Sequence, residues 1–144
     1  GRHVRFLGTR RDVPQILALV DVVALTSHME ANPVSILEAL ACEKPVVATR
    51  VGSVPATVRE GETGCLVEPG DVDSFADRVV HLMRNPDQAQ ALGRAGRNEV
   101  VAHWSIEGMV RGYENLIAEI YASKEDAAWK HATRSAEPPV PTEV

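Results

Sequence analysis

Two glutamates, Glu30 and Glu38, are the residues whose type and spacing could do chemistry. Seven residues separate them, and Glu38 lies in a stretch that is otherwise apolar. A carboxylate among apolar residues is costly unless a partner hydrogen-bonds it. A diol is such a partner, because its two hydroxyls can donate to both carboxylate oxygens. From the residues alone, an exposed Glu38 and an ordinary loop position for Glu30 remain the plainer interpretation.

A helix is predicted to begin just after the first glutamate, over residues 33–42. Asn32 is a favourable N-cap and Pro33 suits the first helical position. The free N–H groups and the dipole at a helix N-terminus favour an anion such as phosphate. Val34 and Ser35 can offer these N–H groups, and Ser35 also a hydroxyl. Together with the glutamates, this predicts a ligand that carries hydroxyls and phosphate, such as a nucleotide-sugar.

Two apolar runs, residues 22–25 and 45–48, flank this stretch and are predicted to be buried strands. A strand that leads into a helix places the helix N-terminus at the carboxyl edge of the sheet, where open α/β sheets bind ligands. Gly52 and Ser53 follow the second run and lie at the same edge. They either approach a phosphate or base, or form an ordinary turn.

The whole chain is predicted to be α/β, with a Rossmann-like, mainly parallel sheet flanked by helices. Helix 33–42 is apolar almost all round, which is typical of a buried helix. Residues 1–124 are expected to form one partial domain, and residues 125–144 a fading helix with a Pro-rich, disordered tail. The expected strands cover residues 4–7, 22–26, 46–49 and 65–67, and the other helices residues 13–20, 55–59, 72–84, 87–103 and 106–124.

Composition excludes several classes of function. A net charge of −5 over 144 residues argues against binding to nucleic acid. No apolar stretch is long enough for a transmembrane segment. Cys42 and Cys65 fit no metal spacing and are expected to be free thiols in a reducing, cytoplasmic compartment. No histidine pair has metal-ligand spacing, so no metal is expected; His28 either enters the sugar site or is a polar loop residue.

The order of several motifs resembles the second half of retaining glycosyltransferases of the GT-B type, the glycosyl transferases group 1 family. The resemblance covers residues 3–110. The paired glutamates alone are a weak motif, but they are specific in this order with their neighbours. The supporting motifs are residues 38–49, Phe6-Leu7-Gly8, Gly52-Ser53-Val54-Pro55, residues 61–67 and Pro69-Gly70-Asp71.

The resemblance implies a role for each matching residue. Glu30 would lie against the donor sugar as the catalytic-site carboxylate, and Glu38 would grip the ribose of the nucleotide. Backbone amides around Asn32, Val34 and Ser35 would meet the sugar and the diphosphate. The implied reaction transfers a sugar from a nucleotide-sugar, such as a UDP- or GDP-sugar, with retention of configuration. It needs no metal and no organic cofactor.

The sequence departs from the family pattern in two places. Ala31-Asn32-Pro33 stands where the family usually has a glycine-rich turn, and Pro33 has no N–H to donate. Ala56 stands where the family often has a glutamate. Both departures bear on how the sugar is held.

Proteins of this family have two such domains, with the acceptor on the first. The resemblance therefore implies an incomplete C-terminal half of a GT-B fold, whose N-terminal domain is supplied by the full-length protein or by another chain. It also implies that strand 4–7 is separated from the other three strands. The alternatives are an enzyme, a catalytically incomplete nucleotide-sugar-binding fragment, or a docking subunit. Peripheral attachment of the full-length protein to a membrane is compatible with each.

Overall fold

The computed structural model describes the backbone of residues 3–134 and the side chains of residues 3–124. The chain forms two units, Gly1–Trp104 and Ser105–Val144. The expected domain extent of 1–124 stays a prediction. The expected Pro-rich tail, residues 135–144, lies outside the described residues.

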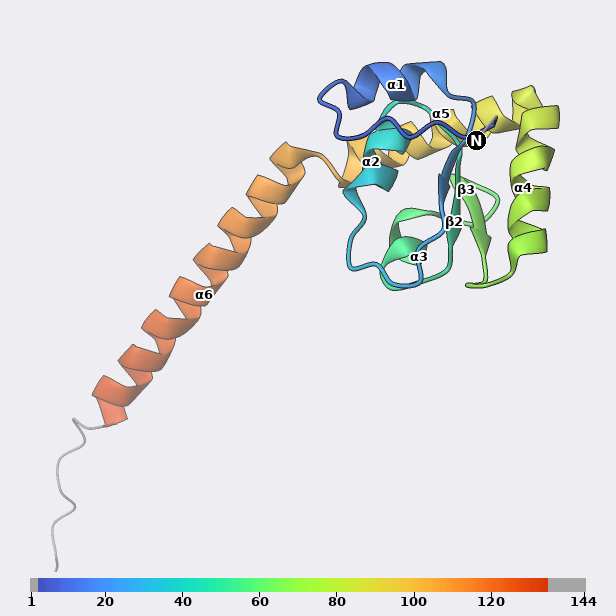
Figure 1. Cartoon of the computed structure of the whole chain (residues 1–144). Coiled ribbons are helices and arrows are strands. Elements are labelled where there is room, and N and C mark those ends of the chain that lie inside the picture. The colour runs from blue at the N-terminus through green and yellow to red at the C-terminus, as the bar shows by residue number, and fades with distance from the viewer. Residues whose placement is uncertain (1–2, 135–144) are drawn as a thin grey trace, which may run out of the picture. The chain divides into compact units, whose positions relative to one another are not determined.

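A three-stranded parallel sheet in the order β1-β2-β3 forms the centre of the first unit (Figure 1). The strands are β1 (Val23–Leu25), β2 (Val46–Thr49) and β3 (Gly64–Val67). Ala24 pairs with Val47, and Val47 with Cys65, so the strands are in a common register. The predicted α/β class with a parallel sheet is therefore confirmed.

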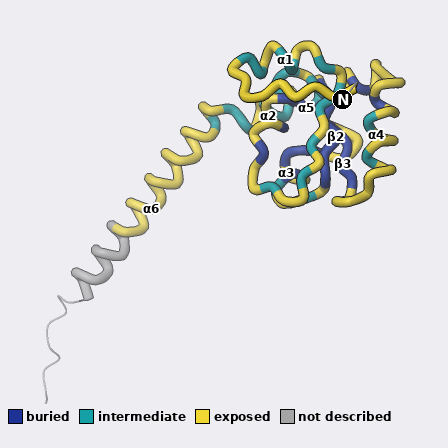
Figure 2. The backbone as a smooth tube through the Cα atoms, in the orientation of Figure 1, coloured by how far each residue is buried: buried dark blue, intermediate teal, exposed yellow. Residues whose placement is uncertain are grey.

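Helices cover both faces of this sheet, and the burial of the strands follows from that (Figure 2). On one face, Ile36 and Leu40 of α2 pack with Val46 and Ala48 of β2. On the other face, apolar residues of α4 and of the start of α5 pack on β2 and β3. The helices are α1 (Val13–Leu19), α2 (Val34–Ala41), α3 (Val54–Thr57), α4 (Val72–Arg84) and α5 (Pro86–His103).

The expected strand over residues 4–7 is wrong. These residues are exposed, with Phe6 92% exposed, and the sheet within residues 3–134 consists of the other three strands. A strand forms only where its N–H and C=O groups find a neighbouring strand, and none pairs with residues 4–7 in the described range. For a related reason β1 is only half-buried rather than buried: it pairs with β2 alone, and Ala24 is exposed.

Helix α2 begins one residue later than expected and is buried on one side only. Pro33 has an extended backbone (ψ 100°) and occupies the N-cap, so Asn32 is not the cap and Pro33 is not the first helical residue. Ile36 and Leu40 are buried, whereas Val34 is 60% exposed. The prediction of a helix buried all round is therefore wrong, and the outer side of α2 is available to a ligand.

Helix α5 docks closely on the end of α2. A Cβ on Gly93 would lie 2.0 Å from the carbonyl oxygen of Glu43, so only glycine fits there. Glu43 itself follows α2 with a φ of 59°, in the left-handed region that favours glycine. The turn after α2 therefore carries backbone strain at a residue that has a side chain.

The second unit is the helix α6 (Ile106–Arg134), which is longer than the predicted 106–124. Ser105 caps it as expected, because its Oγ accepts a hydrogen bond of 3.1 Å from the Gly108 N–H. Large apolar side chains along this helix, such as Tyr113, are exposed. Over the described part of the chain, no helix is both long and apolar enough to cross a membrane.

Candidate functional site

Two loops meet at the carboxyl edge of the sheet, one after β1 and one after β2. Figure 1 shows the loop before α2 and the short helix α3 at this same end of the sheet. Thr49, the last residue of β2, donates its hydroxyl to the carbonyl oxygen of Ser27 at 2.5 Å. Ser53 donates its hydroxyl to the carbonyl oxygen of Ala31. The loop after β1 is thus hydrogen-bonded to the end of β2 and to the loop that follows it.

Gly52, in the loop after β2, also lies against the backbone of the loop after β1. Its φ is +51°, and a Cβ built on it would lie 1.7 Å from the carbonyl oxygen of Glu30. Any larger residue would push the Glu30 backbone away. Glycine is required here both for its conformation and for the close approach.

Glu30 is half-buried and held through its carboxylate. Ser27 donates its hydroxyl to Oε1 of Glu30 at 2.6 Å. Within residues 3–124, no other hydrogen bond or ion pair reaches this carboxylate, so Oε2 is open to a ligand. Sequence reasoning missed Ser27 and Thr49 as partners of the loop. A hydroxyl three residues before a glutamate was the available signal, while the Thr49 contact depends on the pairing of β1 with β2.

The N-terminus of α2 is open. Its N-cap, Pro33, makes no side-chain capping bond, and its first turn carries no acidic residue. The N–H groups of Val34 and Ser35 belong to the first turn, where a helix offers no internal partner. Such a terminus suits an anion. Asn32 lies exposed just before it.

Glu38 lies one turn further along α2 and is exposed. The structure therefore places the predicted residues of the first loop and of α2 along one loop–helix junction at the carboxyl edge. Gly52 and Ser53 are brought against this loop, and both touch its backbone. The donor-binding roles of all these residues stay predictions.

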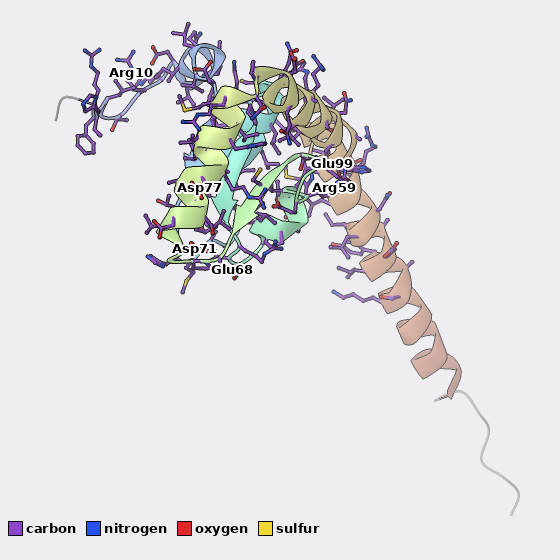
Figure 3. The ribbon with its side chains drawn as sticks, turned by 90° about the vertical axis from the view of Figure 1, so that its right-hand side faces the viewer. Arg10, Arg59, Glu68, Asp71, Asp77 and Glu99 are labelled. Carbon is purple, nitrogen blue, oxygen red and sulfur yellow. The ribbon has the colours of Figure 1, made fainter. Side chains whose placement is uncertain are left out.

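A hollow of about 250 Å³ lies at the same edge, on the side of α4. His28, Thr49 and Phe75 are among its lining residues. Figure 3 shows Glu68 and Asp71 at this end of the molecule. Hydrogen bonding from the side chain and backbone N–H of Ser74 lowers the pKa of Asp71. Another hollow, of about 450 Å³, lies at the opposite edge, away from Glu30 and Glu38, where Asp21 and Pro45 are among its lining residues.

Comparison with known proteins assigns the family. The profile of the family described as "Glycosyl transferases group 1" matches residues 1–85, which include both loops and all of α2. The chain belongs to the glycosyl transferases group 1 family. The resemblance predicted from the motifs is therefore confirmed.

Relatives show how much of a group 1 glycosyltransferase the chain represents. It is 33% identical over 118 residues to an N-acetyl-alpha-D-glucosaminyl L-malate synthase of Bacillus anthracis, covering 82% of this chain and 31% of that protein. The chain thus spans about a third of the length of this relative.

Solved structures agree on the fold. The C-terminal domain of a glycosyl transferase group 1 family protein (LpcC) from Francisella tularensis has a TM-score of 0.64 and 27% identity, over 72% of this chain and 53% of that one. The Anabaena protein Alr3699/HepE in complex with UDP-glucose has a TM-score of 0.69 and 30% identity, over 83% of this chain and 32% of that one. The fold is accordingly that of a partial C-terminal half of a GT-B glycosyltransferase.

Proposed function

We propose that this chain carries the donor-binding region of an enzyme that transfers a sugar from a nucleotide-sugar to an acceptor with retention of anomeric configuration. In this proposal Glu30 binds hydroxyls of the donor sugar and Glu38 binds the ribose. The observation that carries it is the junction itself: a half-buried Glu30 with one open carboxylate oxygen precedes an uncapped helix N-terminus. A hydroxyl-bearing group and a phosphate group of one ligand can be bound there together.

The chemistry follows from the charge that develops as the sugar leaves. The departing nucleoside diphosphate gains negative charge, and N–H groups fixed before the reaction stabilise that charge without reorganising. In this proposal the amides of Val34 and Ser35 take this role, supported by the helix dipole. Asn32 adds an exposed amide beside them. We propose that the step needs neither a metal nor an organic cofactor, because backbone donors and the dipole act on the diphosphate directly.

The donor class is proposed from the same junction and from one relative. The HepE structure was solved with UDP-glucose, and the chain is 30% identical to it over the matched region. A UDP-sugar is therefore the first donor to test, followed by a GDP-sugar, the other donor that the family resemblance implies.

A second candidate is supported by a separate observation. The chain spans 31% of the length of a related synthase, and its strand β1 leaves Ala24 exposed at the edge of the sheet. These facts favour a region that binds the donor but needs a partner domain before it can transfer the sugar. That domain would come from the full-length protein or from another chain.

Calorimetric titration of the chain tests the proposal. UDP, GDP and ADP are compared with UDP-glucose, GDP-mannose and ADP-glucose, in the wild type and in Glu38→Gln. We expect saturable binding of one nucleotide series, weakened about tenfold or more by Glu38→Gln because a charge-assisted hydrogen bond to the ribose is lost. Glu107→Gln, an exposed glutamate of the second unit, is the matched control and should leave binding unchanged. Equal affinity in Glu38→Gln would refute the ribose role, and no binding of any series would refute the donor site.

A further inference from the structure

We infer that Ser27 and Thr49 are positioning residues that hold Glu30 in one orientation, so that a single oxygen of its carboxylate is presented to the donor sugar. The inference rests on the proposed function for the identity of the ligand. Its geometric part rests on the contacts of the loop alone.

The chain of contacts begins in the sheet. Thr49 ends β2, is 5% exposed, and is therefore fixed by the strand that carries it. Its hydroxyl donates to the Ser27 carbonyl oxygen at 2.5 Å and so ties the loop to the strand. Ser27 in turn donates its hydroxyl to Oε1 of Glu30 at 2.6 Å, the length of a charge-assisted bond. The carboxylate is thereby connected to the buried sheet through two hydroxyls.

The Glu30 backbone is held from the neighbouring loop at the same time. Gly52 lies against its carbonyl group, and Ser53 bonds the carbonyl oxygen of the next residue, Ala31. The side chain of Glu30 is thus held through Ser27 and Thr49, and its backbone is held from the loop after β2. This arrangement gives Gly52 and Ser53 a part in holding the loop, while the donor contact predicted for them stays a prediction.

The consequence for recognition follows from the chemistry of a carboxylate. A glutamate side chain has several rotatable bonds, and ordering it on binding costs free energy that a fixed rotamer avoids. With Oε1 engaged by Ser27, Oε2 is the oxygen left to accept a sugar hydroxyl. Neither Glu38 nor the N-terminus of α2 takes part in this contact. Loss of the Ser27 hydroxyl should therefore weaken binding of the sugar part of the ligand and not of the nucleotide part.

The first measurement needs no ligand. Three-bond coupling constants of the Glu30 side chain should show one dominant χ1 rotamer in the wild type and averaged couplings in Ser27→Ala. Ser27→Thr, which restores a hydroxyl, should return the couplings toward the wild-type values. Ser123→Ala removes a hydroxyl that bonds a carbonyl oxygen within α6 and is the matched control. Unchanged Glu30 couplings in Ser27→Ala would overturn the positioning role.

The second measurement compares UDP-glucose with UDP, or GDP-mannose with GDP if the guanine series binds. We expect the preference for the sugar conjugate to fall about tenfold in Ser27→Ala, with the affinity for the free nucleotide unchanged and the preference recovered in Ser27→Thr. An equal loss for conjugate and nucleotide would show a general structural effect and overturn the inference. Failure of the wild type to bind any nucleotide overturns the proposed function and the ligand part of this inference, while the coupling constants still decide the positioning part.

Thr49 provides a second route to the same conclusion. Thr49→Val removes the hydroxyl that fastens Ser27, whereas Thr49→Ser keeps it. We expect the Glu30 couplings to average in Thr49→Val and to remain close to wild type in Thr49→Ser. The reverse order, or equal couplings in the two variants, would contradict the connection through Ser27.

Discussion

Glu43 should be a site where a single substitution to glycine stabilises the protein. It follows helix α2 with a φ of 59°, a conformation that costs a residue with a side chain roughly 1–2 kcal/mol and glycine almost nothing. Two effects oppose the gain. Glycine has more freedom in the unfolded chain, which costs roughly 0.4–1 kcal/mol. The substitution also removes the ion pair of Glu43 with Arg97.

That ion pair is weak by its geometry. The Arg97 Nε and Glu43 Oε1 atoms are 3.6 Å apart, and both side chains are about half exposed. Pairs of this kind contribute roughly 0–1 kcal/mol, usually near the lower limit. Arg97 also keeps its bond to the carbonyl oxygen of Ala41 without Glu43. We therefore expect Glu43→Gly to raise the free energy of unfolding by about 0.5 kcal/mol.

The matched control is Glu43→Ala, which loses the same ion pair but keeps a side chain in the left-handed conformation. Urea unfolding followed by circular dichroism should place Glu43→Gly about 1 kcal/mol above Glu43→Ala, and Glu43→Ala at or slightly below the wild type. If the alanine and glycine variants were equally stable, backbone strain at this turn would be negligible. If both were much less stable than the wild type, the contact with Arg97 would dominate, and the reasoning would be wrong.

Three further expectations concern other parts of the first unit. Gly52→Ala and Gly61→Ala both replace a glycine of positive φ, but the new Cβ meets the Glu30 carbonyl oxygen at 1.7 Å only at Gly52, and nothing lies within 4 Å at Gly61. Denaturant unfolding should show that Gly61→Ala lowers the free energy of unfolding by about 1 kcal/mol and that Gly52→Ala lowers it clearly more. Equal losses of stability would contradict the close approach at Gly52. Asp71 caps α4 by accepting a hydrogen bond of 3.0 Å from the Ser74 N–H, and its pKa lies below the ordinary 3.8. The contribution of the ionised cap to stability is therefore complete above pH 3.8 and is lost as the pH falls through the lower folded-state pKa. The difference in Tm between wild type and Asp71→Ala should be constant near neutral pH and narrow below about pH 4, and a constant difference down to pH 2 would exclude the ionised cap. Burial raises the pKa of the Cys65 thiol, and this residue is 5% exposed, whereas Cys42 is half-buried. A thiol reagent at pH 8 should therefore label Cys42 first and Cys65 only on unfolding, and simultaneous labelling would contradict the packing of β3.

Local patterns predicted the parts of the fold that depend on neighbouring residues. The apolar runs became β1, β2 and β3, and the amphipathic segment after Asp71 became α4 with Asp71 as its cap. These elements were predictable because helix and strand propensity, hydrophobic periodicity and capping depend on residues close together in the sequence.

The expected strand 4–7 and the missed loop contacts share one cause, which is dependence on distant contacts. Residues 4–7 have the composition of a strand, but a strand exists only beside another, and no neighbour is present in the described range. The hydrogen bond from Thr49 to Ser27 and the close approach of Gly52 to Glu30 form only when β1 pairs with β2. No local sequence pattern therefore predicts them. The sequence predicts a candidate site as a set of residue types around Glu30 and Glu38, whose donor-binding roles stay predictions. It does not predict how the carboxylate and backbone of Glu30 are held.

An amide NMR titration of the chain with the nucleotide-sugar tests the donor site most directly. A formed site predicts saturable shifts confined to residues 30–38 and 50–54, because the loop of Glu30, the N-terminus of α2 and the loop after β2 meet at one edge of the sheet. The shifts should need about tenfold more ligand or higher to saturate in Glu38→Gln, and they should be unchanged in Glu107→Gln. A well-dispersed spectrum that does not change with any UDP-, GDP- or ADP-sugar would contradict the account.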